Sequence, residues 1–285
     1  MVPSPNMRST VNHLVQLQEL TLIRDEQRSI RGAGADLGAL NGSIDSLADS
    51  LDPAVKVVRD RLYKKDHIVM APMNDGSCSV CGMKLAISVV QAVKLCRSLV
   101  TCPSCARILY DPDGAKWVAE RPKRSSGEHK SGVARFSAPE LMVPDLAADT
   151  PEAAIRELAG TLQAGKFVDD ADKLVEAAMA RENTVPTGVG RGLAFPHVRG
   201  IEGGGLSLAF GTSRKGIKWG GADDAPVHFV FFSTIPTAVS MFYLRLIAGL
   251  SESYAKEPNR KAVLEAADAP ALWKALVKAT RATVK

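Results

Sequence analysis

Apolar side chains recur along the N-terminal part of the chain in steps of three and four residues. The run begins at Ile30 and reaches Val58 without a slip. This spacing is the a/d repeat of a coiled coil, and it is sustained over four heptads. We therefore predict a coiled-coil helical region over residues 7–70. The repeat positions are Ile30, Ala33, Leu37, Leu40, Ile44, Leu47, Leu51, Ala54 and Val58.

Four glycines argue against one unbroken helix through this repeat. Each glycine costs about 1 kcal/mol relative to alanine in a helix interior. Upstream, a second apolar stripe runs from Leu14 to Ile23 in less regular spacing. A turn near residues 32–36 would fold the first helix back on the second, so we expect a helical hairpin. The glycines are Gly32, Gly34, Gly38 and Gly42.

The C-terminal half alternates helical and strand-like patterns. Thr150 can cap a helix that has Pro151 at its first position and ends at Gly165. Apolar runs at residues 206–210 and 227–232, bounded by glycine or polar residues, predict buried strands. Because strands interleave with helices, we expect an α/β fold, a mixed-sheet sandwich over residues 136–285. Further helices are expected at about 170–182, 237–254, 258–267 and 270–280.

Composition places the boundaries between these parts. Residues 120–135 are rich in Arg, Lys, Pro, Ser and Gly without apolar periodicity, which predicts a flexible basic linker. We expect the helical region to end at residue 70 and a cysteine-containing domain to occupy residues 71–119.

Whole-chain composition is that of a soluble globular protein. Hydrophobic residues make up 46% and charged residues 24% of the 285 residues. Pro236 and Arg245 interrupt the longest apolar segment, and the N-terminus has no signal-like run, so we expect a cytoplasmic protein without a membrane span. The net charge of +5 lies in residues 1–135, because the remainder carries 17 basic against 17 acidic residues. This excess is modest beside the basic stripe typical of nucleic-acid binding.

Four cysteines form two C-x-x-C pairs. Cys78 and Cys81 are separated by twenty residues from Cys102 and Cys105. This spacing is typical of a four-cysteine zinc site, which we expect to be structural because four thiolates leave no open coordination position. The alternative, a pair of disulfides, fits a reducing compartment poorly. Cys96 lies outside both pairs, and we interpret it as a small buried hydrophobe.

A glycine-rich run leads into a histidine between Thr187 and His197. Glycines at three alternate positions permit sharp turns and close approach, and Pro196 stiffens the chain directly before the histidine. An imidazole is nucleophilic near neutral pH, and Arg191 and Arg199 are close enough in sequence to supply positive charge. His197 could thus accept a phosphoryl group. The alternative is a turn leading into a strand beside a structural histidine.

This run resembles a known active-site signature. Arg181–Glu182, Thr187–Gly190 and Gly192–His197 look like the signature of the IIA component of the bacterial phosphotransferase system, of the fructose, mannitol and nitrogen-regulatory type. The resemblance covers about residues 136–285 and implies that His197 takes a phosphoryl group from the phosphocarrier HPr or its nitrogen-branch counterpart. One position departs from the pattern. Many members carry a second histidine where this chain has Tyr243, which can donate a hydrogen bond but cannot take a proton as imidazole does.

The N-terminal part resembles a second family. Residues 76–85 and 100–110, with the four cysteines, are similar to a bacterial zinc-ribbon domain that follows a coiled-coil hairpin. The resemblance covers roughly residues 7–112. That family commonly has glycine where this chain has Ala106.

Together these patterns predict a phosphotransferase IIA-type protein that serves regulatory signalling. We expect Arg181 and Arg191, with Thr187 and Tyr243, to support the phosphoryl group on His197, and we expect His228 to be structural. An HPr-like donor and a separate target or IIB protein are the expected partners, since no cysteine follows Cys105 as an attached IIB acceptor. The rival interpretation is a non-enzymatic protein that has lost phosphoryl transfer and whose ribbon binds nucleic acid or another protein.

Overall fold

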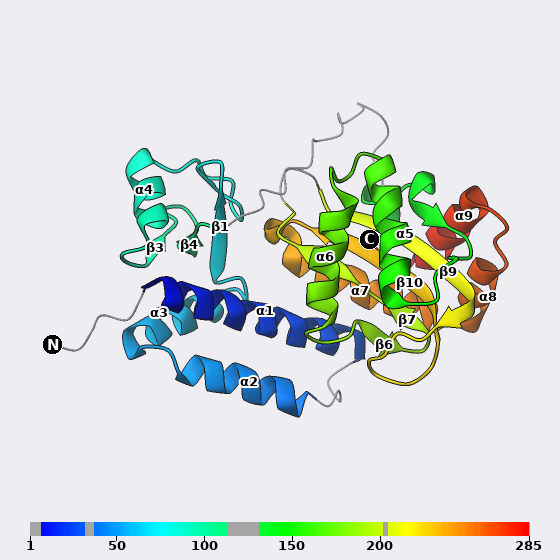
Figure 1. Ribbon diagram of the computed structural model, residues 1–285, viewed down its shortest axis with the longest axis horizontal. Helices are drawn as coiled ribbons and strands as arrows, with labels where there is room; N and C mark the ends of the chain where they lie inside the picture. Colours follow the sequence, from blue (N-terminus) through cyan, green and yellow to red (C-terminus); the bar gives the residue numbers. More distant parts are fainter. Residues whose placement is uncertain (1–6, 32–36, 113–130, 202–204, 285) are drawn as a thin grey trace. The chain divides into compact units, whose positions relative to one another are not determined.

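The computed structural model describes residues 7–31, 37–112, 131–201 and 205–284. It divides into two compact units, Met1–Lys116 and Trp117–Lys285 (Figure 1). The linker expected over residues 120–135 lies outside the described residues for most of its length.

Three helices form the N-terminal part of the first unit. They are α1 (Met7–Arg31), α2 (Gly38–Asp49) and α3 (Pro53–Tyr63). Helices α1 and α2 contact each other, as a hairpin requires, and the expected turn at residues 32–36 lies outside the described residues. The a/d repeat is divided between α2 and α3, because Asp52 accepts a hydrogen bond from the Ala54 amide and Pro53 occupies the first helical position. Leu51, at this break, is buried in the core that the helices share.

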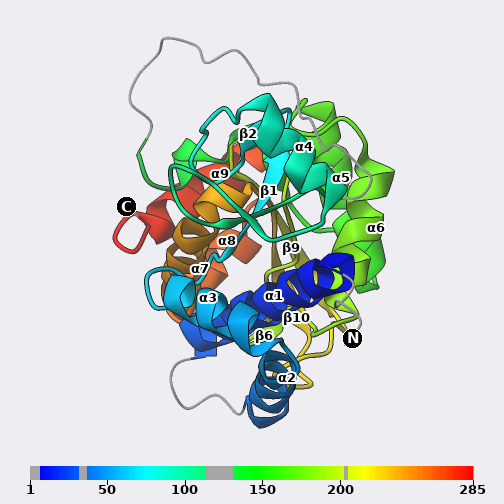
Figure 2. The same cartoon turned by 90° about the vertical axis from the view of Figure 1, so that its left-hand side faces the viewer.

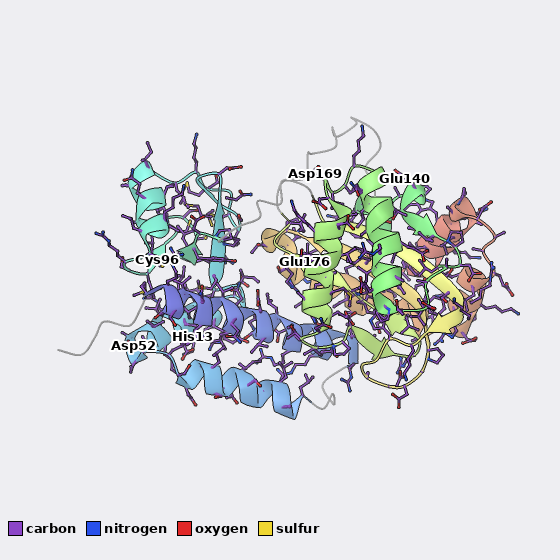
Figure 3. All side chains as sticks on the ribbon, in the orientation of Figure 1. His13, Asp52, Cys96, Glu140, Asp169 and Glu176 are labelled. Atoms are coloured by element: carbon purple, nitrogen blue, oxygen red, sulfur yellow. The ribbon has the colours of Figure 1, made fainter. Side chains whose placement is uncertain are left out.

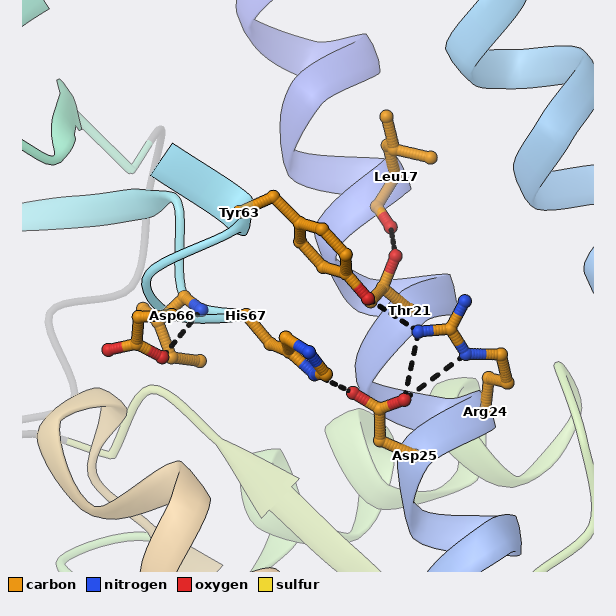
Figure 4. Close-up of polar contacts among 8 residues, drawn as sticks. Leu17, Thr21, Arg24, Asp25, Tyr63, Asp66 and His67 are labelled. Carbon is orange, nitrogen blue, oxygen red and sulfur yellow. Dashed lines mark hydrogen bonds and ion pairs between the residues drawn. The ribbon is translucent and has the colours of Figure 1, made fainter. Parts of the chain in front are cut away.

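Polar side chains tie the end of α3 to α1 (Figure 4). Arg24 donates to Asp25 Oδ1 and, over 2.6 Å, to the Tyr63 hydroxyl. Asp25 also pairs with His67 Nδ1, and the His67 ring stacks on Tyr63 with 4.5 Å between centroids. These contacts fix the connection between α3 and the strand that follows it.

A small sheet completes the first unit. Its strands run in the order β2 (Ser77–Cys78), β1 (Met70–Asn74), β4 (Ile108–Tyr110) and β3 (Val100–Thr101), and helix α4 (Ile87–Leu95) lies between β2 and β3 in sequence. The β1–β4 pair is parallel and the other two are antiparallel.

One side chain of α1 joins the sheet to the helices. The Gln18 Oε1 atom accepts hydrogen bonds from the backbone amides of Val69 and Met70, over 2.6 and 2.7 Å. Its Nε2 atom donates to the Met70 carbonyl over 3.2 Å. The Gln18 amide thus holds the start of β1 against α1.

The second unit is built on a mixed sheet, as expected. Long antiparallel strands β9 (Ser207–Ile217) and β10 (Val227–Ile235) form its centre, and β5 (Met142–Val143) pairs in parallel with β9. On the other side β10 pairs in parallel with β7 (Leu193–Ala194) and β8 (His197–Arg199). Strand β6 (Gly188–Gly190) pairs with β7 to complete the order β5-β9-β10-β7-β6.

Helices cover both faces of this sheet. Figures 1 and 2 show α5 (Pro151–Ala164) and α6 (Ala171–Glu182) on one face. On the other face lie α7 (Ser240–Tyr254), α8 (Glu257–Leu264) and α9 (Ala269–Thr280). Thr150 caps α5 as predicted, accepting a hydrogen bond from the Ala153 amide over 3.2 Å. In the described part of the chain, no helix combines the length and apolarity that a bilayer crossing demands.

Candidate functional site

The glycine run folds into a β-hairpin. Strand β6 (Gly188–Gly190) pairs with β7, and the Phe195 amide donates to the Thr187 carbonyl at the base of the hairpin, over 3.2 Å. Gly190 and Gly192 have φ of +85° and +75° at the tip, a region that favours glycine. Gly188 has a different role, because a Cβ there would lie 2.1 Å from the Gly220 carbonyl oxygen.

His197 opens β8, two residues beyond the hairpin. It pairs with Ser233 of β10, so the backbone beneath the imidazole is fixed by the central sheet. Its Nδ1 atom lies 3.0 Å from the Phe195 carbonyl oxygen. Because a carbonyl can only accept, Nδ1 carries the proton of the neutral ring, and the nucleophilic lone pair is on Nε2.

Tyr243 and Arg199 lie beside His197. The Tyr243 ring, in the first turn of α7, has its centroid 5.2 Å from that of the imidazole. The guanidinium carbon of Arg199 lies 5.7 Å from the same Tyr243 centroid. His197 and Arg199 are two residues apart on β8 and therefore project from the same face of the strand. The Tyr243 position is thus at the site, and Arg199 is the cation that the strand carries there.

A buried carboxylate holds the base of the hairpin. Glu182, the last residue of α6, accepts hydrogen bonds from the Thr187 amide over 2.6 Å and from the Thr187 hydroxyl over 2.7 Å. It also accepts one from Trp219 Nε1 over 2.8 Å. Thr187 is therefore placed through Glu182, whose role sequence reasoning missed although the residue falls inside the resembling signature. The sequence signal for this role was weak, since Trp219 lies 37 residues away.

Arg181 also contacts the segment that connects α6 to the hairpin. Its Nη1 atom donates to the Val185 carbonyl over 2.7 Å, between α6 and the hairpin. Helix α6 contacts β8, so Arg181 lies on an element that packs against the strand of His197.

Arg191 is not brought to His197. It occupies the hairpin tip, with φ of +56°, and its amide donates to Asp223 Oδ2 over 3.1 Å. Leu193 and His197 pair with Phe229 and Ser233 of β10 in one continuous register, so the four-residue step from Leu193 to His197 spans about 13 Å of extended chain. This separation of the two backbones along the sheet does not favour the expected pocket shared by Arg191 and His197, and that expectation stays a prediction.

His228 lies at this same distant end of the sheet. Its Nδ1 atom is 2.8 Å from the Ser213 carbonyl oxygen. A Cβ on Gly192, next to Arg191, would lie 3.4 Å from the His228 ring. These contacts place His228 away from His197, near the tip of the hairpin.

The four paired cysteines converge in the first unit. Their sulfur atoms lie within 4.8 Å of one another, with 3.8 Å between Cys78 and Cys105 and 3.6 Å between Cys81 and Cys102. A tetrahedral zinc ion with Zn–S bonds of about 2.3 Å requires sulfur separations of about 3.8 Å, whereas a disulfide requires about 2.05 Å. The arrangement fits zinc and not disulfides.

The two turns that present these thiols have matching backbones. Cys78 donates its amide to Met83 and accepts from Gly82, while Cys102 donates to Arg107 and accepts from Ala106. Gly82 has φ of +74°, and Ala106 has φ of +61° at the equivalent place. Ala106 therefore occupies a conformation that favours glycine.

The thiols differ in their readiness to ionise. Burial raises the pKa of the Cys78 thiol to about 12. Burial also raises the pKa of the Cys81 thiol, but hydrogen bonds from the Met83 amide and the neighbouring cysteines outweigh it and lower that pKa to about 7. A metal ion, which binds thiolates, must therefore displace the proton of Cys78 at neutral pH.

Comparison with known proteins gives one family match in each unit. Residues 136–279 match the family described as the phosphoenolpyruvate-dependent sugar phosphotransferase system, EIIA 2. Residues 77–109 match the C4-type zinc ribbon domain.

Individual relatives match the second unit. Over 117 residues the chain is 35% identical to the PTS system fructose-specific EIIA component of Haloferax volcanii, covering 41% of this chain and 76% of that protein. Over 115 residues it is 30% identical to the PTS system fructose-specific EIIABC component of Bacillus subtilis, covering 40% of this chain and 18% of that protein. The solved structure of the nitrogen regulatory protein IIA-Ntr from Neisseria meningitidis also matches. The match covers 50% of this chain and 97% of that one, with 20% sequence identity and a TM-score of 0.46.

Proposed function

The chain belongs to the EIIA 2 family of the phosphoenolpyruvate-dependent sugar phosphotransferase system, and on that premise we propose that His197 accepts a phosphoryl group from an HPr-like phosphocarrier protein. The observation that carries this proposal is the contact between His197 Nδ1 and the Phe195 carbonyl oxygen. It orients the ring so that the nucleophilic lone pair is that of Nε2.

The transfer needs little covalent chemistry from the protein. The Nε2 lone pair forms a bond to phosphorus as the bond between phosphorus and the donor's imidazole breaks, and the donor leaves as a neutral histidine. The imidazolium character that develops on His197 is stabilised by the hydrogen bond from Nδ1 to the Phe195 carbonyl. Catalysis then rests on positioning and on positive charge near the phosphoryl oxygens, which Arg199 and Arg181 supply.

Tyr243 bears on what happens after acceptance. Its ring lies beside the imidazole, where a phenolic hydroxyl can donate a hydrogen bond to a phosphoryl oxygen. It offers no imidazole to exchange protons during onward transfer. We infer that the phosphorylated chain acts chiefly as a signal to a separate protein, a regulatory target or a IIB protein, rather than as a step in sugar uptake.

The zinc ribbon has a structural part in this proposal. Cys78, Cys81, Cys102 and Cys105 would hold one zinc ion and fill its coordination shell. The zinc ion would cross-link the two turns, and its filled shell would leave no open coordination position for a reaction. The helical region and ribbon then form the non-catalytic arm of a IIA-type protein.

Phosphoryl uptake tests the assignment. Incubation with a phosphorylated HPr-type protein should give an acid-labile, base-stable label on the chain, and His197→Ala should abolish it. His228→Ala is the matched control, because that histidine lies at the far end of the sheet, and it should change the rate by less than about threefold, an effect below about 0.7 kcal/mol. Retention of label in the His197→Ala chain would overturn the proposal, and absence of label in the unaltered chain would favour the non-catalytic alternative.

A further inference from the structure

Helix α4 exposes large aliphatic side chains. Among the described residues five large hydrophobic side chains are exposed, and two of them, Ile87 and Leu95, at 78% and 60%, lie on α4. A third, Met83, 42% exposed, lies four residues before the helix. Ile87 and Leu95 are eight residues apart with Gln91 midway, so Ile87, Gln91 and Leu95 share one face of the helix. Val93, on the opposite side, is buried in the ribbon core. Exposed apolar side chains gathered on one face mark an interaction site more often than scattered ones do.

The segment that carries this face contains basic residues but no acidic ones, whereas Asp111, which follows it, lines the same cleft as Lys94 and Arg8. From Gly76 to Tyr110 the sequence contains no Asp or Glu and four basic residues. One of them, Arg107, pairs with Asp66, whereas Lys84, Lys94 and Arg97 are exposed around α4. A zinc ion with four thiolates carries a formal charge of −2, so the segment keeps a net charge of about +2 when the metal is bound.

A cleft lies at the C-terminal end of α4, beside Lys94. It measures about 220 Å³ and lies between α1, the end of α4 and the end of β4. Its apolar walls include Val11, Val15 and Val93, and Cys96 lines it at the C-terminal end of α4 (Figure 3). Lys94 lines the cleft and borders the aliphatic face. A cavity of about 150 Å³ can hold a benzene ring, so this cleft has room for an aliphatic side chain.

We propose that the α4 face and the adjoining cleft dock an acidic protein segment that carries aliphatic side chains. Acidic residues complement Lys84, Lys94 and Arg97, and aliphatic residues cover Ile87 and Leu95. The eight-residue step from Ile87 to Leu95 extends about 12 Å along the helix, so the segment presents aliphatic contacts at about that spacing, as the anchors of an amphipathic helix do. Nucleic acid fits less well, because single strands stack on aromatic side chains and the exposed groups here are aliphatic.

Selection from a random peptide display library tests this proposal directly. The zinc-loaded full chain is the target, and Ile87→Ser/Leu95→Ser is the comparison. We expect the enriched peptides to carry net negative charge and paired aliphatic residues. The double variant should bind them at least about tenfold more weakly, as loss of interface anchors does. Val57→Ser, at another exposed aliphatic residue (69% exposed), is the matched control and should leave binding unchanged.

Charge and competing ligands complete the test. Lys84→Glu/Lys94→Glu should weaken binding of the same peptides, and added salt should weaken it in the unaltered chain. Zinc content confirms that each variant retains a folded ribbon. The proposal fails if selection gives no acidic peptides, if the double serine variant binds them equally well, or if a labelled single-stranded oligonucleotide binds α4 more tightly than they do. None of these outcomes involves His197, so the phosphoryl proposal stands or falls separately.

Discussion

Arg199 lies on the same strand as His197, whereas Arg191 lies at the tip of the hairpin, away from His197. Both are within six residues of the histidine in sequence. Arg199 shares a strand face with it and lies over the Tyr243 ring, whereas Arg191 sits at the tip of the hairpin. Arg199 is two residues from His197 and Arg191 is six, but the sequence did not show that the chain runs extended from the hairpin tip to His197.

The rates of arginine variants should reflect this difference. We expect Arg199→Ala and Arg181→Ala each to slow phosphoryl acceptance by one to two orders of magnitude, or roughly 1.4–2.7 kcal/mol of lost transition-state stabilisation. Arg191→Ala should change the rate by less than about threefold and serves as the matched control. Rates of label uptake from a phosphorylated HPr-type donor measure this. A large loss in Arg191→Ala alone would contradict the proposed site.

Glu182 should be a large contributor to stability. Glu182→Ala leaves Thr187 and Trp219 donors without their acceptor in the interior, so we expect the free energy of unfolding to fall by about 2–4 kcal/mol. Glu176→Ala is the matched control, since this exposed residue lies on the same helix (Figure 3), and it should stay within about 0.5 kcal/mol. Urea unfolding followed by tryptophan fluorescence measures both. Equal stability of the two variants would show that Glu182 is dispensable.

At the scale of elements, long amphipathic segments were predictable and short ones were not. The cap at Thr150 and the apolar face behind it identified α5, whereas β6, β7 and β8 have two or three residues each and no apolar alternation. The a/d repeat at residues 30–58 continued through Pro53, so its division into α2 and α3 was missed. Spacing did identify the cysteine cluster, because two C-x-x-C turns leave few alternatives.

The two cysteine turns allow a reciprocal test at Ala106 and Gly82. Ala106→Gly should stabilise the zinc-loaded ribbon by about 1 kcal/mol, because a residue with a Cβ costs roughly 1–2 kcal/mol in this conformation. Gly82→Ala should destabilise it by a similar amount. Thermal unfolding under reducing conditions with zinc present gives both values. Changes of the same sign in the two variants would refute the strain argument.

The whole molecule divides into units whose proposed chemistry is separate. Zinc removal should therefore unfold the ribbon and leave phosphorylation of His197 largely intact. Cys102→Ser should lose the metal, whereas Cys96→Ser, outside the cluster, should retain about one zinc per chain. Elemental analysis and label uptake on the same samples test this, and loss of label on zinc removal would show that the units depend on each other.

Acidification should release zinc, because protons compete with the metal for the thiolates. Cys78, with its pKa raised to about 12 in the absence of metal, must lose its proton when zinc binds at neutral pH. The apparent zinc affinity should therefore fall as the pH falls. Competition with a chromogenic chelator at several pH values measures this, and an affinity independent of pH would contradict thiolate ligation.

Gln18 couples movements of the ribbon to movements of helix α1. Helix α1 has 25 residues and extends about 37 Å, and the Gln18 amide clips the first strand of the ribbon to its N-terminal half. A movement of the ribbon is therefore transmitted to a continuous helix rather than to a loop. A protein bound at α4 would displace α1 together with the ribbon, including the end of α1 that it does not contact.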